Sequence, residues 1–361
     1  MATLSLPPTA SKPAELKLSK IAAFLGMRVL AWHNDLLYAS RGYELLRAKI
    51  VPKQNAIHWE HVATAEPAWW RKLSCFSRLT ARLFRDGFHA LAVLQSGGLV
   101  AAIPNAIVTL LPGEPEFSTT HRVLRGTRPL HLAVTPNNNV FWGEYFDNPL
   151  RDEVHVYAST DDGRHWDVAY SFPRNSIRHV HNIVYDQWEN CLWILTGDSG
   201  RECRIIRASC DFRDVQVLLS GSQQTRSAAL VPAPDGLYFS SDTPLEQNHI
   251  YHLDRRGNLT RLSALISSSI CACCVGEDLF LSTMVEPSPA NPHREVGIYG
   301  RAGTASFGAL LSWQKDAWPM RLFQYGNAVF PDGDNSSGVL ALTTIAVKHS
   351  DCETSLWRIS H

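Results

Sequence analysis

One turn decides the fold: Ser159-Thr160-Asp161-Asp162-Gly163-Arg164-His165-Trp166, with the pattern S-x-D-x-G-x-x-W. Ser159 and Asp161 can hydrogen-bond the backbone of this turn, and Gly163 can adopt a positive φ. Trp166 can fold back over the turn as a small apolar core. Alternating apolar residues flank the turn at 154–158 and 168–170. This alternation predicts two antiparallel β-strands joined by the turn.

A larger unit recurs along the chain, in which two apolar strands are followed by a polar loop and two more strands. The second strand of each unit ends in small or acidic residues, at 38–40, 101–103, 143–145, 196–198, 240–242, 281–283 and 342–344. These ends are about 40–60 residues apart, near the ~40–50 residues of propeller repeats. Hairpin-turn residues separate first and second strands at 33–35, 96–98, 136–139, 233–236, 276–278 and 331–334. The sequence therefore predicts an all-β, seven-bladed β-propeller of four-stranded blades.

One segment departs from this pattern. Between blades one and two, residues 65–87 place Trp69, Leu73, Phe76, Leu79 and Leu83 at helical spacing. We expect an inserted helix or linker whose apolar face packs against the side of the propeller. The alternative is a helix that binds a partner.

Composition sets the remaining boundaries. Residues 1–15 are rich in Pro, Ser, Thr and Ala, so we expect disorder over residues 1–20 and a single propeller domain over 21–361.

The charge balance says what the protein is not expected to bind. The chain has 34 Lys and Arg and 34 Asp and Glu, which gives no reason to expect nucleic acid or an anionic membrane as a partner. The apolar run at 21–30 is short and contains Arg28, so we expect neither a signal peptide nor a membrane span. With eight cysteines, we expect a cytoplasmic protein with reduced thiols.

The chain resembles the Asp-box (BNR-repeat) propellers of the sialidase-like superfamily. The match rests on the turn at 159–166, on a degenerate copy at 209–214 that lacks the Gly and the Trp, and on the segments 143–146, 242–248 and 323–327. This resemblance implies a propeller over about residues 25–361. The superfamily includes sialidases, other glycosidases, polysaccharide lyases and purely binding proteins. The chain lacks an Arg-Ile-Pro motif at the start of the propeller, so the resemblance does not imply sialidase activity.

Three arginines lie at similar positions in successive blades. In a propeller, function gathers at one mouth of the channel, in the loops before first strands and between second and third strands. Arg128, Arg178 and Arg226 precede three successive first strands, and converging guanidinium groups would bind a carboxylate. In the alternative, each arginine pairs with a neighbouring carboxylate such as Glu144 or Asp198.

Three histidines are expected at the same mouth. His131 and His181 share a register at the start of adjacent inner strands, and His179 lies on the same side as His181. Three imidazoles can supply a general base or bind a divalent metal, whereas the alternative is a set of hydrogen-bonded inner-strand residues. Their spacing matches no recognised metal motif, so no cofactor is predicted.

Carboxylates and tyrosines complete the candidate site. Glu144 and Asp198, on adjacent blades, form the best pair for acid–base chemistry. Tyr325 is a candidate nucleophile, and Tyr145 is expected to point away from Glu144 because side chains alternate along a strand. The further candidates for substrate binding are Asp242, Gln247 and Arg294.

The sequence therefore predicts a carbohydrate-active enzyme, a glycosidase or polysaccharide lyase, that acts on an acidic oligosaccharide. The predicted catalytic residues are Glu144, Asp198, His179, His181 and Tyr325. The predicted substrate-binding residues are Arg128, His131, Arg178, Arg226, Tyr145, Asp242, Gln247 and Arg294. The alternative is a non-catalytic propeller scaffold that binds a glycan or a protein.

Overall fold

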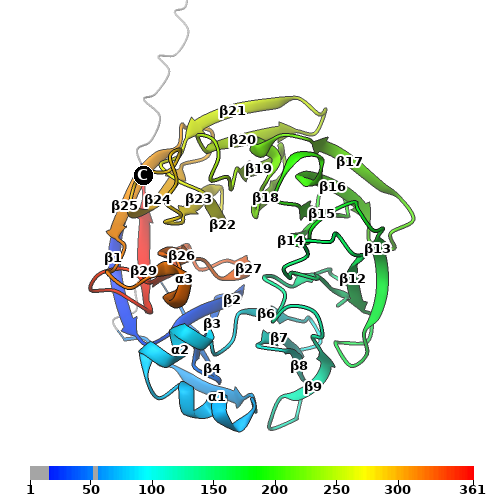
Figure 1. Cartoon of the computed structure of the whole chain (residues 1–361). Helices are drawn as coiled ribbons and strands as arrows, with labels where there is room; N and C mark the ends of the chain where they lie inside the picture. The colour runs from blue at the N-terminus through cyan, green and yellow to red at the C-terminus, as the bar shows by residue number, and fades with distance from the viewer. Residues whose placement is uncertain (1–15, 52–55) are drawn as a thin grey trace, which may run out of the picture.

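Seven β-sheets form a ring in the computed structural model, which describes residues 16–51 and 56–361 (Figure 1). Each sheet is one propeller blade, so the predicted all-β, seven-bladed architecture is confirmed. All seven predicted second-strand segments lie in or directly after the second strands of their blades.

The strands follow one another outward from the centre of the ring. Blade one contains β2 (Arg28–Asn34), β3 (Leu36–Arg41), β4 (Glu44–Lys49) and β5 (Glu60–Thr64). Blade two contains β6 (Ala90–Val93), β7 (Leu99–Ile103), β8 (Ala106–Leu110) and β9 (Ser118–Arg122). Blade three contains β10 (Ala133–Val134), β11 (Val140–Gly143), β12 (Val154–Ser159) and β13 (Asp167–Phe172). Blade four contains β14 (Val180–Asp186), β15 (Cys191–Thr196), β16 (Arg204–Ser209) and β17 (Val215–Ser220).

The remaining blades complete the ring. Blade five contains β18 (Ala229–Ala233), β19 (Gly236–Ser240), β20 (His249–Asp254) and β21 (Leu259–Ala264). Blade six contains β22 (Ser269–Val275), β23 (Asp278–Thr283), β24 (Glu295–Arg301) and β25 (Gly308–Gln314). Blade seven contains β26 (Asn327–Val329), β28 (Val339–Ile345), β29 (Glu353–Ser360) and β1 (Lys17–Leu25).

The two ends of the chain close the ring together. Strand β1 pairs antiparallel with β29, from Lys17 opposite Ser360 to Leu25 opposite Glu353. The first described strand is therefore the outermost strand of the last blade. Residues 17–20 of the predicted disordered segment belong to β1, and residues 1–15 lie outside the described residues.

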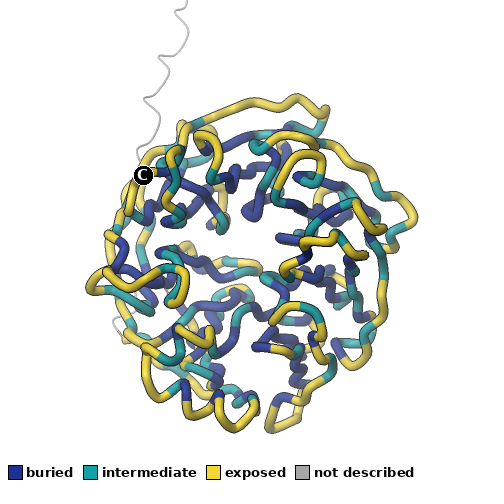
Figure 2. Tube along the Cα trace, viewed as in Figure 1, coloured by how far each residue is buried: buried dark blue, intermediate teal, exposed yellow. Residues whose placement is uncertain are grey.

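Apolar side chains fill the spaces between neighbouring blades. For example, Val100 and Ile107 of blade two share a core cluster with Val140 and Trp142 of blade three. Blades one and seven share a similar cluster, so packing continues around the closed ring. Burial accordingly concentrates on the inner strands, whereas the outer strands and many loops are exposed (Figure 2).

The turn at 159–166 has the predicted local geometry. The backbone N–H of Gly163 donates to Ser159 Oγ at 2.9 Å, and the N–H groups of Arg164 and His165 donate to Asp161 Oδ1 at 3.1 and 3.0 Å. Gly163 has a φ of +82°, and Trp166 packs against the core cluster of blades two and three. The degenerate copy in blade four retains a hydrogen bond from Ser209 Oγ to Asp211 Oδ1 at 2.6 Å.

The segment at 331–334 corrects a prediction. It was expected to be a hairpin turn, but residues Asp332–Asn335 form β27, which pairs parallel with β2 of blade one. Figure 1 shows β27 extending from blade seven into the centre of the ring. The pairing adds a segment that lies between β26 and β28 of blade seven to the innermost strand of blade one, and no local turn pattern predicts that long-range contact.

Two short helices occupy the predicted insertion at 65–87. They are α1 (Trp69–Ser74) and α2 (Arg78–Phe84), and a third helix, α3 (Met320–Phe323), lies against α2. Two 3₁₀ turns, η1 (Gly200–Glu202) and η2 (Gln223–Thr225), precede later strands. Within 16–51 and 56–361, no helix has the length and apolar character needed to cross a membrane.

The orientation of these helices reverses the expectation that their apolar face packs on the propeller. The buried residues of α1 are Arg71 and Ser74, and the buried residue of α2 is Arg82. The apolar residues are exposed instead, with exposed fractions of 73% for Trp69, 58% for Leu73, 87% for Phe76, 42% for Leu79 and 40% for Leu83. The reason is the set of carboxylates underneath: Arg71 pairs with Asp86 and Arg82 with Asp316, both at 2.6 Å.

Candidate functional site

A cavity of about 330 Å³ opens at the centre of the ring, where the loops before the first strands meet. The predicted site residues in its wall are Arg128, His131, Tyr145, His181, Arg226, Asp242 and Tyr325. The other predicted residues lie behind the wall or away from it. Seven of the 13 predicted side chains therefore reach the cavity, fewer than strand register suggested.

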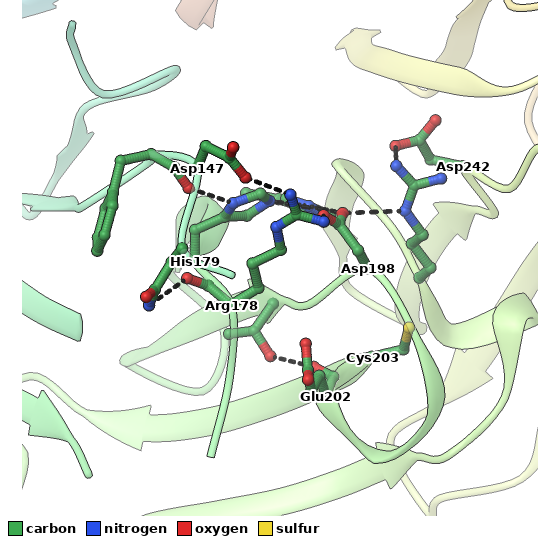
Figure 3. A network of polar contacts seen from close by, with 12 residues as sticks. Asp147, Arg178, His179, Asp198, Glu202, Cys203 and Asp242 are labelled. Carbon is green, nitrogen blue, oxygen red and sulfur yellow. Dashed lines mark hydrogen bonds and ion pairs between the residues drawn. The ribbon is translucent and has the colours of Figure 1, made fainter. Parts of the chain in front are cut away.

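Asp198 is the centre of a polar network beside this cavity (Figure 3). It follows β15, and its Oδ1 lies 3.2 Å from His181 Nε2 and 3.5 Å from His179 Nε2. Its carboxylate also accepts from Arg178 Nη1 at 3.2 Å and from Arg226 Nε at 3.3 Å. The structure thus brings together five of the predicted residues, all of them from blades four and five.

Both arginines in this network are held by carboxylates. Besides Asp198, Arg178 pairs with Asp147, and Arg226 Nη2 lies 3.7 Å from Asp242 Oδ2. The pairing with neighbouring carboxylates that the alternative interpretation expects is therefore present for these two arginines.

The two histidines contact each other directly. Their Nε2 atoms are 2.9 Å apart, and both rings are buried. His179 Nδ1 lies 2.9 Å from the carbonyl oxygen of Phe146, and His181 Nδ1 lies 3.0 Å from that of Ser227. The ring of Tyr145 packs against His179 with centroids 4.4 Å apart.

Burial and hydrogen bonding set the charges in the network. Burial raises the pKa of Asp198, but hydrogen bonds from His179 and His181 outweigh it and hold the pKa well below its usual value. Burial lowers the pKa of His181 from its usual value, although the hydrogen bond to Asp198 opposes the shift. Burial also raises the pKa of Asp242 to about 7, and Asp242 Oδ1 has no hydrogen-bond partner among the described residues.

Glu144 does not form the predicted acid pair with Asp198. Its carboxylate accepts from Arg125 Nε at 2.8 Å and from the backbone N–H of His155 at 2.8 Å. Glu144 is buried and fully partnered within blade three, whereas the adjacent Tyr145 faces the cavity. The two neighbours have different surroundings although both follow the end of β11, so the strand alternation on which the expectation depended does not apply to them.

The other predicted residues occupy different surroundings. His131 Nδ1 lies 3.4 Å from Asp332 Oδ2 on β27, so it is separate from the other two histidines. The Gln247 side chain donates to the carbonyl oxygen of Leu265 at 2.5 Å, as part of a loop. Arg294 is exposed, and Tyr325 is part of the cavity wall.

A second group of basic residues in the cavity wall was missed. Arg28, Arg85 and His89 line it together with Arg128. Burial, together with the charges of Arg28 and Arg85, lowers the pKa of Arg128 to about 9. No ion pair joins Arg28, Arg85 or Arg128 to a carboxylate within 4.0 Å in the described part of the chain. Arg28 begins the inner strand of blade one, so the register that identified His181 also applies to Arg28.

No protein-family model matches the chain, and no curated protein matches it. Solved structures do match. A chain from the crystal structure of the mitotic checkpoint complex aligns with a TM-score of 0.55 and 12% identity, over 100% of this chain and 99% of that one. The WD40 β-propeller domain of Doa1 aligns with a TM-score of 0.58 and 13% identity, over 95% of this chain and 97% of that one.

These findings correct the predicted function. The prediction of a carbohydrate-active enzyme for an acidic oligosaccharide is wrong, because the similar structures include a WD40 β-propeller domain and a chain of the mitotic checkpoint complex, and the Glu144–Asp198 acid pair does not form. At 12–13% identity, the similarity establishes the fold alone: this chain is a seven-bladed β-propeller.

Proposed function

We propose that this protein is a non-catalytic propeller scaffold that binds a partner protein through its inserted helices. The observation that supports this proposal most strongly is the inverted orientation of α1 and α2, which bury arginines and expose aromatic and aliphatic side chains. A surface helix that packs on its own domain normally does the reverse. Exposed apolar clusters on a folded protein typically mark interaction sites.

The proposed docking site, here called the helix surface, includes residues from α1, α2 and the segment of α3. Its members are exposed to between 39% and 87%: Trp69, Trp70, Leu73, Phe76, Leu79, Leu83, Phe84, Trp318 and Leu322. Tryptophan and phenylalanine are enriched in protein interfaces, and tryptophan often dominates their binding energy. The composition of the helix surface therefore suits a protein partner.

Buried polar contacts support a rigid helix surface. Arg82 donates to Asp316 and also to the carbonyl oxygen of Phe323, at 3.0 Å from Nε and 2.6 Å from Nη2. Arg71 donates to Asp86, which also accepts from the Ser74 hydroxyl. A preorganised surface loses less conformational entropy when a partner binds.

The basic cavity wall beside the helices suggests the charge of the partner. A second, smaller cavity between the helices and the channel shares Arg28, His89 and Gln324 with the central one. We propose that the partner presents apolar side chains to the helix surface and an acidic side chain toward Arg28, Arg85 and Arg128.

Two expectations from the sequence stay predictions: the resemblance to Asp-box propellers and the cytoplasmic location.

Site-specific photo-crosslinking tests this function. A photoreactive phenylalanine analogue at position 76 probes the helix surface, and the same analogue at position 218 is the control. Leu218 is 42% exposed on β17, the outer strand of blade four. We expect one protein to be cross-linked reproducibly from position 76 and not from position 218. Equal labelling from both positions, or adducts only with a second copy of this chain, would contradict the proposal.

A further inference from the structure

The strongest unassigned feature is the convergence of three potential metal ligands. The Nε2 atoms of His179 and His181 and a carboxylate oxygen of Asp198 all lie within 4.8 Å of one another. Both rings are buried, and His181 also lines the cavity, so the cluster lies at the wall of the channel. Nothing in the proposed docking function requires this arrangement.

The hydrogen bonds on the far side of each ring decide which nitrogen has the proton. A carbonyl oxygen only accepts hydrogen bonds, so His179 Nδ1 donates to Phe146 and His181 Nδ1 donates to Ser227. In a neutral imidazole with a proton on Nδ1, Nε2 has a free lone pair. The two Nε2 atoms lie 2.9 Å apart and face Asp198 Oδ1, so a cation that replaces any proton on Nε2 would meet three ligand atoms.

A cation among these three atoms would be coordinated by all of them at once, while each ring stays oriented by its backbone carbonyl. We propose that His179, His181 and Asp198 bind a divalent transition-metal cation of the zinc type. Two imidazoles and a carboxylate are typical ligands of Zn²⁺ in proteins. The backbone carbonyls on Nδ1 are the outer-shell partners that metal-binding histidines normally have.

The distances agree with this ion. Ligand atoms at about 2.0–2.2 Å from a tetrahedral Zn²⁺ are about 3.3–3.6 Å from each other. The three separations here are 2.9, 3.2 and 3.5 Å. A small outward movement of the His181 ring is enough to admit the ion, because the two separations shorter than the tetrahedral value, 2.9 and 3.2 Å, both involve His181 Nε2.

The neighbouring arginines leave room for the metal. A carboxylate has about four lone-pair directions. Arg178 pairs with Asp198 Oδ2, whereas Arg226 occupies one lone-pair direction of Oδ1. The second lone pair of Oδ1 therefore remains for the ion. Three protein ligands leave one tetrahedral position for an outside ligand such as water.

The bound ion would connect three blades. The ligands belong to blade four, whereas the carbonyls that orient the two rings belong to the loop after β11 in blade three and the loop before β18 in blade five. Binding of the ion to the folded chain alone must therefore raise the melting temperature. This prediction separates a bound metal from a proton shared by the two rings.

Zinc titration of the full-length, tag-free chain tests the proposal. After treatment with a chelator, the protein is titrated with ZnCl₂ by calorimetry and, separately, with CoCl₂ while its visible absorption is recorded. We expect one ion per chain, a higher melting temperature with zinc, and the intense absorption of tetrahedral Co²⁺. If the wild type shows no saturable zinc binding and no thermal shift, the rings share a proton and the proposal is overturned.

Matched variants locate the ion. His181→Gln and Asp198→Asn should weaken zinc binding at least about 10-fold, as loss of metal-site groups generally does. The control is His131→Gln, because His131 lines the same cavity but contacts Asp332 instead of the cluster. It should bind zinc like the wild type. Equal affinity in all three variants would place the ion elsewhere and overturn the assignment, and the wild-type cobalt spectrum remains informative if a variant fails to fold.

Discussion

Arg82 on α2 contacts Asp316, a residue 234 positions later in the chain, with Nη1 and Oδ2 2.6 Å apart. The side chain of Arg82 is 4% exposed. This ion pair joins the helical insertion of blade one to the segment that leads into blade seven. It fixes the polar side of α2 to the protein and leaves its apolar side facing outward.

Replacing Arg82 should therefore loosen the helix surface. Arg82→Met leaves Asp316 and the carbonyl of Phe323 without this donor, and breaking one partner of a buried pair costs about 3–5 kcal/mol. The control on the same helix is Arg78→Met, since Arg78 pairs with Asp351 but is 40% exposed, and such pairs contribute about 0–1 kcal/mol. Urea denaturation of both variants measures the difference. Similar losses in the two would show that the Arg82 contact does not anchor the helices.

Two phenylalanines test which side of the insertion is buried. Phe76→Ala should change the free energy of unfolding by no more than about 0.5 kcal/mol, because Phe76 is 87% exposed. Phe88→Ala, in the core cluster of blades one and two, should cost about 3–5 kcal/mol. Equilibrium unfolding gives both values. A large loss for Phe76→Ala would mean that the helices pack their apolar face on the propeller after all.

Asp198 and Asp147 share Arg178 as a partner but differ in their surroundings. Asp198→Asn removes the charge that holds two arginines and two histidines, so we expect a loss of about 3 kcal/mol. Asp147→Asn should cost less than about 1 kcal/mol because its side chain is 78% exposed. Thermal or chemical denaturation without added metal compares the two. Equal effects would refute the central position of Asp198 in the network.

Asp242 should make stability depend on pH. Burial raises its pKa from 3.8 to about 7 in the folded protein, so the folded state binds this proton more tightly than the unfolded chain does. The contribution of Asp242 to stability therefore falls as pH rises from about 4 to about 7, and it is constant above and below that window. Relative to wild type, Asp242→Asn should gain stability progressively across this range. Denaturation curves at several pH values measure the gain, and parallel curves for the two proteins would contradict the shift.

The blades were predictable because their signals are local. Alternating apolar residues and Asn, Asp and Gly turns define strands within a few residues, and the bonds of Ser159 and Asp161 close one turn within the same segment. The pairing of β1 with β29 and of β27 with β2 joins segments that are more than 300 residues apart. No local sequence pattern predicts the pairing of strands so far apart in the chain.

The candidate site was predictable where strand register determines it and not where long-range contacts do. Strand register placed Arg178, His179, His181, Asp198 and Arg226 at one mouth, and the structure brings them together. Register does not say which neighbour satisfies a buried carboxylate, so the contact of Glu144 with Arg125 was not foreseen. The helical spacing of apolar residues likewise predicted the inserted helices. Their orientation, however, depends on the distant carboxylate of Asp316.

The affinity of the helix surface for the protein cross-linked at position 76 is the most direct test of the docking function. Calorimetry with that purified partner compares the wild type with two variants that each truncate an exposed apolar side chain. Phe76→Ser lies between α1 and α2, and Leu218→Ser lies on β17. We predict that Phe76→Ser weakens binding at least about 10-fold, as expected for an aromatic hot spot, and that Leu218→Ser leaves it unchanged. Equal affinity of all three proteins would show that the partner binds elsewhere on the propeller.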